Sequence, residues 1–295
     1  MNNLMKFKVW YFVFSILIIL PGLYFLFTSG LRLGIDFTGG ALLEYKFEKN
    51  ININELKQQI SSQGIEVGQV TPSSDNIYII RTKPVEQDKI SKLKSNLAEK
   101  FGQVEERRVE FVGPVIGSEL RKKAIIGVAL ASLVIVLYIA FSFRKIPKPQ
   151  SSWRFGIAAV VALLHDILVV VGVFAILGKL LNIEIDTLFV TALLTVIGFS
   201  VHDTIVVFDR IRENLRKHMG NKFITVANLS VVQTLGRSLN TSLTVVFVLL
   251  AMLLFGGETI RWFIVALLVG IISGTYSSIF NATALLVWWE EKLGH

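Results

Sequence analysis

Six long apolar stretches alternate with more polar segments along the 295-residue chain. They cover residues 9–28, 124–143, 157–177, 188–209, 238–255 and 262–288, and the fifth helix is expected to begin earlier, near Val231. About 20 apolar residues are enough to cross the hydrocarbon core of a bilayer as a helix. The pattern therefore predicts a polytopic membrane protein with six transmembrane helices.

Residues 29–123 form one polar insertion between the first two apolar stretches. Strand patterns at 40–47, 67–71, 76–82 and 104–112 alternate with helical patterns at 51–62 and after Pro84. The order β-α-β-β-α-β is that of a ferredoxin-like split fold. We therefore expect three parts: residues 1–28 with the first helix, an extracytoplasmic α+β domain at 29–123, and a five-helix bundle at 124–295.

Composition supports this class and excludes several kinds of site. Hydrophobic residues make up 53% of the chain, charged residues only 18%, and the mean hydropathy is +0.60, whereas soluble domains are about 25% charged. The chain has no cysteine, so disulfides, thiolate nucleophiles and cysteine-based metal sites are excluded. The first stretch is too long for a typical signal peptide and lacks an A-x-A site, so we interpret it as a retained anchor.

The distribution of basic residues predicts the orientation. If both termini are cytoplasmic, the two short outer loops carry only Lys179 and Arg261. The cytoplasmic side then carries Lys6, Lys8, Arg144, Lys145, Lys148, Arg154, Arg210, Arg212, Arg216, Lys217, Lys222 and Lys292. This bias follows the positive-inside rule. It also accounts for most of the net charge of +8, which suits anionic lipid head groups rather than nucleic acid, because no nucleic-acid-reading element is evident.

Charged residues inside apolar stretches are candidates for function, because an unpaired charge in the bilayer is costly. Asp166 lies near the middle of the third stretch, and Asp203 lies near the inner end of the fourth. If the fifth helix begins near Val231, Arg237 reaches a similar depth and faces Asp203. Asn240 and Thr241 share the polar helix face of Arg237.

Two interpretations of these charges remain open from the residues alone. In the first, Asp203 exchanges a proton while Arg237 moves toward or away from it. In the second, the two residues form a static ion pair that fixes helix packing. Possible accessory relay groups are Asp166, His202, Asn240 and Thr241, and His165 beside Asp166 would only satisfy its hydrogen bonds. His165 and His202 are interpreted as hydrogen-bonding groups rather than metal ligands. The mixed-charge segment at Asp209 and Arg210 is interpreted as a solvated helix turn.

Two glycine-containing segments predict close backbone approaches. Residues 34–40 (GIDFTGG) lack the Lys-Ser/Thr of a phosphate-binding loop, so they are either a turn into the first strand or a contact surface. The last apolar stretch carries small and polar residues that permit close helix packing. They are Gly270, Gly274, Ser277, Ser278 and Asn281.

Four segments resemble the SecD/SecF family of protein-export membrane proteins, and its SecF branch in particular. The segment at 198–214 (GFSVHDTIVVFDRIREN) looks like the family signature in the fourth span. The segment 34–40 is similar to the motif after the first span, 237–242 (RSLNTS) to the opening of the fifth, and 112–117 (VGPVIG) to the approach to the second. The resemblance covers nearly the whole chain in order.

This resemblance implies partners and an energy source. The family belongs to the RND superfamily of proton-driven transporters and resides in the bacterial plasma membrane. SecF works with SecD, and the pair associates with the SecYEG channel and YajC. It uses the proton gradient to draw unfolded preproteins outward after SecA has driven them in. Protons would be the coupling ion, with sodium left open, and no cofactor is implied.

The resemblance also implies roles for particular residues. The intramembrane Asp and Arg of the family match Asp203 and Arg237, which favours the proton relay. Asp36, Gly39, Gly40, Asp209 and Arg210 fall within its motifs and are expected to serve as interaction residues. His202 stands where many members have Asn, so a second titratable group lies beside Asp203.

Two alternative functions are retained. In the first alternative, the chain is a scaffold of the export machinery without ion coupling. In the second, it is half of an RND-type proton-driven efflux transporter. An enzyme is not expected, because no nucleophile–base pair or metal constellation is evident. Neutralising Asp203 separates coupling from scaffolding, since only coupling needs an ionisable group.

Overall fold

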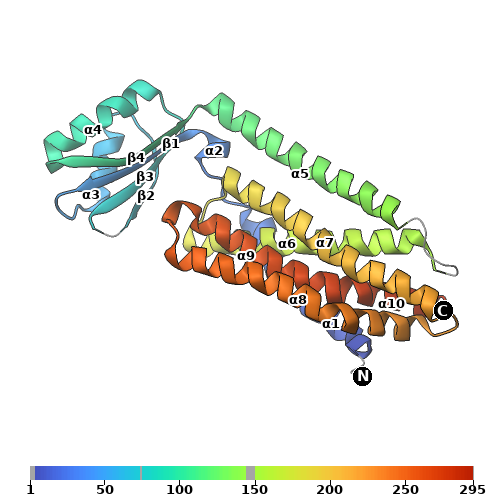
Figure 1. Ribbon diagram of the computed structural model, residues 1–295. Coiled ribbons are helices and arrows are strands. Elements are labelled where there is room, and N and C mark those ends of the chain that lie inside the picture. The colour runs from blue at the N-terminus through green and yellow to red at the C-terminus, as the bar shows by residue number, and fades with distance from the viewer. Residues whose placement is uncertain (1–3, 74, 144–149, 295) are drawn as a thin grey trace. The chain divides into compact units, whose positions relative to one another are not determined.

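A computed structural model describes residues 4–73, 75–143 and 150–294 (Figure 1). The contacts divide the chain into two compact units, one comprising Met1–Arg32 with Gly127–His295 and the other Leu33–Ile126. Arg144, Lys145 and Lys148, which contribute to the orientation prediction, lie outside the described residues.

The described residues contain six helical spans that are long and apolar enough to cross a membrane, as predicted. The first five include the helices α1 (Lys8–Ser29), α5 (Pro114–Ser142), α6 (Ser152–Leu181), α7 (Thr187–Lys217) and α8 (Phe223–Phe255). The sixth is composite, with α9 (Arg261–Tyr276), the π-helical turn η3 (Ser277–Asn281) and α10 (Ala282–Lys292). Short 3₁₀ turns, η1 (Leu4–Phe7) and η2 (Glu258–Ile260), precede α1 and α9.

Several helices extend past their apolar stretches because polar residues can continue or cap a helix. α5 begins at Pro114, where proline is well tolerated as a first helical residue. α7 begins after Asp186, whose side chain accepts a hydrogen bond from the Phe189 amide at 2.9 Å. α8 begins at Phe223, so the expected start near Val231 is wrong.

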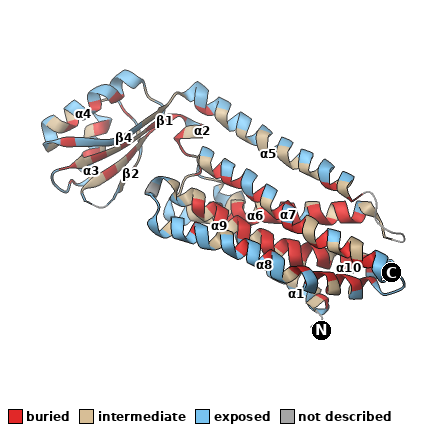
Figure 2. Ribbon diagram, viewed as in Figure 1, coloured by how far each residue is buried: buried red, intermediate tan, exposed pale blue. Residues whose placement is uncertain are grey.

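In the membrane unit, α6, α7, α9 and α10 hold much of the buried surface (Figure 2). α1 packs along α6, and α8 packs against α7 and α9. The α1–α6 contact is close because two glycines meet: a Cβ on Gly22 would lie 2.6 Å from the Cα of Gly172. The predicted small-residue stripe of the sixth span also allows close packing, since Gly270 lies against Val196 of α7.

The second unit is an antiparallel sheet with two main helices. It contains α2 (Ile35–Thr38), β1 (Gly40–Phe47), α3 (Ile53–Ser61), β2 (Val67–Pro72), β3 (Ile77–Thr82), α4 (Gln87–Phe101) and β4 (Val104–Val112). The sheet order is β2-β3-β1-β4, so the predicted ferredoxin-like β-α-β-β-α-β arrangement is confirmed. Its core combines alternate residues of β1, such as Leu43 and Tyr45, with apolar helix faces that include Leu56 and Leu93.

The glycine-rich segment forms the short helix α2 and then enters β1. Gly39 and Gly40 have positive φ values of 75° and 128°. A Cβ on Gly40 would lie 2.2 Å from the Thr82 carbonyl oxygen of β3, and one on Gly39 would lie 2.9 Å from the Cα of Pro114. The two glycines therefore permit both the backbone conformation and the close approach of neighbouring chain segments.

Candidate functional site

Asp203 lies on the buried face of α7, where α8 and α9 pack against it. Only 2% of the residue is exposed. Its one hydrogen bond within the described ranges is long, with the Ser242 hydroxyl of α8 at 3.4 Å from Oδ2. Ser242 in turn accepts a hydrogen bond of 2.6 Å from Thr275 of α9. An ionised carboxylate in this position has few donors to replace water, which makes its charge costly.

Arg237 does not meet Asp203 in this structure. It is exposed on α8, and within the described ranges it forms no ion pair with any carboxylate. Because α8 begins at Phe223 rather than near Val231, Arg237 lies further into the helix than expected. Asn240 and Thr241 are exposed on the same side, whereas Ser238 and Ser242 are buried. The serine face, not the predicted arginine face, is the one that α8 turns toward Asp203.

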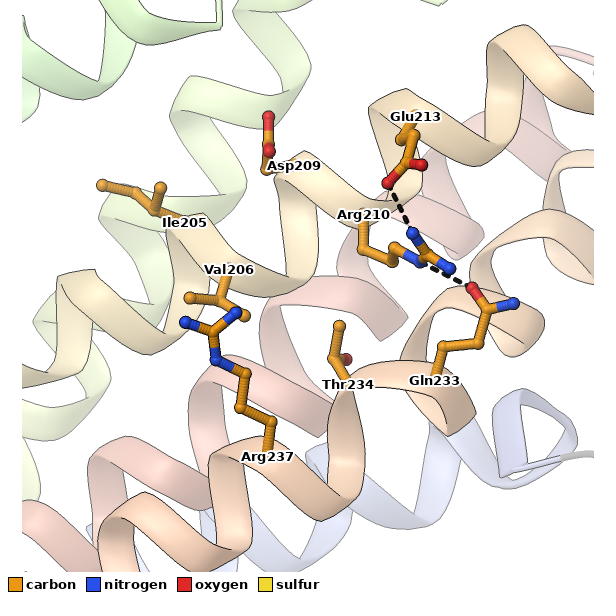
Figure 3. A pocket seen from close by; sticks show the side chains of 8 residues that line it. All are labelled: Ile205, Val206, Asp209, Arg210, Glu213, Gln233, Thr234 and Arg237. Atoms are coloured by element: carbon orange, nitrogen blue, oxygen red, sulfur yellow. Dashed lines mark hydrogen bonds and ion pairs between the residues drawn. The ribbon is translucent and has the colours of Figure 1, made fainter.

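Arg237 lines a pocket of about 370 Å³ between α7 and α8 (Figure 3). The other lining residues are Ile205, Val206, Asp209, Arg210, Glu213, Gln233 and Thr234. Figure 3 shows the Arg237 side chain reaching from α8 toward α7. The pocket therefore leaves space beside the Arg237 guanidinium on the side of α7.

The other charged residues of this pocket are paired. Arg210 bonds to Glu213 at 2.5 Å and to the Gln233 side-chain oxygen at 2.7 Å, so it links α7 to α8. Asp209 pairs with Arg212. Asp209 is exposed and Arg210 partly so, which agrees with a charged helix turn but adds a cross-helix contact. His202 is exposed on α7, next in sequence to the buried Asp203.

Asp166 is the centre of a second buried site, and it is completely inaccessible to solvent. Its Oδ2 accepts hydrogen bonds from Ser200 at 2.6 Å and Ser277 at 2.7 Å. Its Oδ1 lies 2.8 Å from the Ser273 hydroxyl and 2.9 Å from Nδ1 of His165. These contacts join α6 to α7, α9 and the π-helical turn, so Asp166 connects the helices that surround it.

The π-helical turn makes a second polar link to α7. Ser278 donates to the Ser200 carbonyl at 2.9 Å, and its hydroxyl lies 2.8 Å from that of Thr204. The sequence indicated Ser277 and Ser278 only as part of a small-residue stripe, and did not predict the bonds of Ser277 to Asp166 or of Ser278 to α7. The sequence signal that could have indicated this site is the presence of serines on two apolar stretches and an aspartate on a third.

A buried ion pair at the ends of α6 and α10 also escaped sequence reasoning. Arg154 and Glu290 approach to 2.9 Å, and the Glu290 side chain has no exposed surface. Glu290 lies just past the last predicted apolar stretch, and an acidic residue there is normally interpreted as part of a solvated helix end. Among the described residues, no cluster of histidine and acidic side chains has an arrangement that could hold a metal ion.

Comparisons with known proteins match the whole chain. Residues 92–292 match the family described as protein export membrane protein SecD/SecF, C-terminal, and residues 24–51 match the SecD/SecF GG motif. The protein translocase subunit SecF of Thermobaculum terrenum is 49% identical over 99% of this chain and 95% of its own length. SecF of Anaerolinea thermophila is 42% identical, again over 99% and 95%.

Longer proteins match over part of their length. The protein translocase subunit SecDF of Bacillus subtilis is 35% identical over 97% of this chain, which spans 38% of that protein. The crystal structure of SecDF from Thermus, described as a translocon-associated membrane protein, matches 99% of this chain with a TM-score of 0.84 and 33% identity. This chain spans 39% of the Thermus protein.

The matches confirm the resemblance read from residues 34–40 and 198–214. With the six apolar helices, they establish a multi-pass membrane protein with a role in protein translocation. The chain belongs to the SecD/SecF family of protein-export membrane proteins.

Proposed function

We propose that this chain is a SecF-type subunit that uses the proton gradient to assist the export of unfolded preproteins. SecD is its proposed partner, because relatives of Bacillus and Thermus carry the matching part within one longer SecDF chain. In this proposal the pair acts on preproteins at the SecYEG channel, together with YajC and after SecA. The chain lies in the bacterial plasma membrane with both termini in the cytoplasm.

The observation that carries the proposal is the environment of Asp203. Asp203 is 2% exposed, lies within a membrane-spanning helix and has one hydrogen bond, of 3.4 Å, to the described part of the chain. Taking up a proton removes the cost of this poorly solvated charge, and releasing it restores that cost. Moving one charge through 100 mV supplies about 2.3 kcal/mol, which is enough to shift helix packing between two states.

Arg237 supplies the second part of the proposed coupling. Its guanidinium keeps its charge at all relevant pH values, so it can respond to Asp203 only by moving. The pocket between α7 and α8 provides space for that movement. The exposed face that carries Arg237, Asn240 and Thr241 is also available for contact with the SecD partner.

The test is export of a secreted preprotein in cells depleted of the native subunit and supplied with Asp203→Asn. We expect normal membrane abundance with accumulated precursor, and export that no longer responds to a protonophore. Ser242→Ala is the matched control, because it removes the one donor that Asp203 has among the described residues but keeps the ionisable group. Normal export by Asp203→Asn at normal abundance would reject proton coupling at this residue and favour the scaffold.

A further inference from the structure

His165 and Asp166 form a buried dyad on α6. His165 is 8% exposed and Asp166 is not exposed at all. Neighbouring residues on a helix do not normally face each other, yet Nδ1 of His165 lies 2.9 Å from Oδ1 of Asp166. The contact fixes the orientation of the imidazole ring inside the helix bundle.

The hydrogen bonds of Asp166 match those of an ionised carboxylate. Each carboxylate oxygen has two donors. Three of the four donors are serine hydroxyls from α7, α9 and the π-helical turn, and the fourth is Nδ1 of His165. An ionised carboxylate has about four acceptor positions, and here all are used. A proton on Asp166 would require one of these serine hydroxyls to turn and accept instead of donating, so the present arrangement favours the ionised carboxylate.

The other ring nitrogen of His165, Nε2, can accept a proton. Because Asp166 accepts, we assign the hydrogen to Nδ1, which leaves a lone pair on Nε2. Nε2 is buried and has no hydrogen-bond partner among the described residues. A carboxylate that orients an imidazole through Nδ1 also stabilises the imidazolium formed when Nε2 accepts a proton.

We infer that Nε2 of His165 is a second proton-binding atom in the membrane unit, held ready by Asp166. Protonation forms one N–H bond and converts a neutral imidazole beside an anion into an imidazolium–carboxylate pair. In the described part of the chain no lysine or arginine pairs with Asp166, so this proton neutralises the dyad. Its role in export rests on the proposed proton coupling, but proton binding itself is measurable separately.

The surroundings of the dyad leave His165 as the group that changes charge. Tyr276 of α9 is the nearest titratable ring, 6.4 Å from the imidazole, and its hydroxyl donates to the Tyr11 carbonyl. On the other helices packed against α6, the titratable or charged groups of the described residues include Lys8, Tyr11, Tyr24, His202, Asp203, Glu290 and Glu291. Lys8 pairs with Glu291, and Glu290 pairs with Arg154.

Nitrogen-15 NMR of the histidines in the reconstituted complex with the SecD partner tests proton binding directly. The chain has four histidines, and the resonances lost in His165→Asn identify the ring. Spectra recorded from about pH 8 to pH 5 are expected to show a neutral ring with its hydrogen on Nδ1 that takes up a second proton on Nε2 as the pH is lowered. A ring that stays in one state over this range, or a neutral ring with its hydrogen on Nε2, would overturn the inference.

A functional measurement separates proton binding from a purely structural role. The asparagine of His165→Asn can keep a donor near the Nδ1 position but lacks Nε2, whereas His165→Gln places its amide near Nε2. At normal membrane abundance, we expect the pH dependence of proton-driven export in proteoliposomes to flatten in both variants, with activity at the optimum down about tenfold. An unchanged pH profile in His165→Asn overturns the role of His165 in export, whereas the NMR titration decides proton binding itself.

Including Asp203→Asn in the same assay keeps the two ideas distinct. Loss of coupling in Asp203→Asn with an unchanged His165→Asn profile rejects only the role of His165. Normal export by Asp203→Asn rejects the coupling proposed at Asp203, while the NMR titration still decides whether His165 binds a proton.

Discussion

Gly40 lies at the start of β1, against the Thr82 end of β3, and its conformation makes a strong prediction about substitution. Both Gly40 and Gly64 have positive φ values, 128° and 75°. A Cβ on Gly40 would lie 2.2 Å from the Thr82 carbonyl oxygen, but one on Gly64 would meet nothing within 4 Å. We expect Gly40→Ala to lower the free energy of unfolding by about 2–4 kcal/mol and Gly64→Ala by about 1 kcal/mol.

Hydrogen exchange of the outer-unit amides in the full-length chain measures this difference, because faster exchange reports the loss of stability. Equal effects of the two substitutions would mean that positive φ alone matters and that β1 can move away from Thr82 without cost.

Tyr45 provides a pH-dependent test in the same strand. Burial, and then the negative charge of Glu106 opposite it on β4, raise the pKa of Tyr45 to about 12. A raised pKa means that the folded state holds the proton more tightly, so this stabilisation is complete below about pH 10 and is lost as pH rises through 12. The shift of two pKa units corresponds to at most about 3 kcal/mol.

The absorbance difference between the protein and Tyr45→Phe isolates the ionisation of this one side chain. We expect its tyrosinate to form near pH 12, well above the range of an exposed tyrosine. Formation of the tyrosinate near pH 10 would show that water reaches the hydroxyl and that the β1 core is more open than the structure indicates.

At the scale of helices, the contact between α1 and α6 depends on two glycine backbones. A Cβ on Gly172 would lie 2.9 Å from the Cα of Gly22, whereas one on Gly156, also on α6, would meet nothing within 4 Å. Alanine normally stabilises a helix relative to glycine by about 1 kcal/mol. We therefore expect Gly156→Ala to raise the melting temperature slightly and Gly172→Ala to lower it by several degrees.

Thermal unfolding of the full-length protein in detergent checks the direction of both changes. Because the two substitutions add the same methyl group to the same helix, only the facing backbone differs. A higher melting temperature for Gly172→Ala would show that α1 does not pack tightly against α6.

The helices also show why the sequence predicted the fold better than the site. Apolar length and period suffice to locate six spans and the outer β-α-β-β-α-β unit. They do not reveal that α8 begins at Phe223, because the residues before Val231 are mixed in polarity. That error shifted the expected depth of Arg237, and the buried face of α8 places Ser242, not Arg237, beside Asp203.

The serines around Asp166 illustrate a second limit. Ser200, Ser273 and Ser277 are far apart in the sequence, and serine in a transmembrane helix usually indicates only close packing. The π-helical turn adds a residue to the helical period, so Ser277 and Ser278 both reach polar partners. A regular period cannot predict such a turn, and so the cluster became visible only in three dimensions.

At the scale of the whole molecule, the orientation in the membrane is still a prediction, and the absence of cysteine makes it directly testable. Single cysteines can be introduced at Ser61, exposed at the end of α3, and at Met219, which is 85% exposed between α7 and α8. If the basic bias sets the topology, an impermeant thiol reagent added outside intact spheroplasts modifies Ser61→Cys but not Met219→Cys.

Inside-out vesicles should reverse this result, and permeabilised membranes should allow both cysteines to react, which controls for reactivity. Labelling of Met219→Cys from outside, with Ser61→Cys protected, would mean that the chain is inverted. The outer unit would then lie in the cytoplasm, where it could not help to draw a preprotein outward. The same result would reverse the direction in which protons must reach Asp203, so the topology decides the polarity of the proposed coupling.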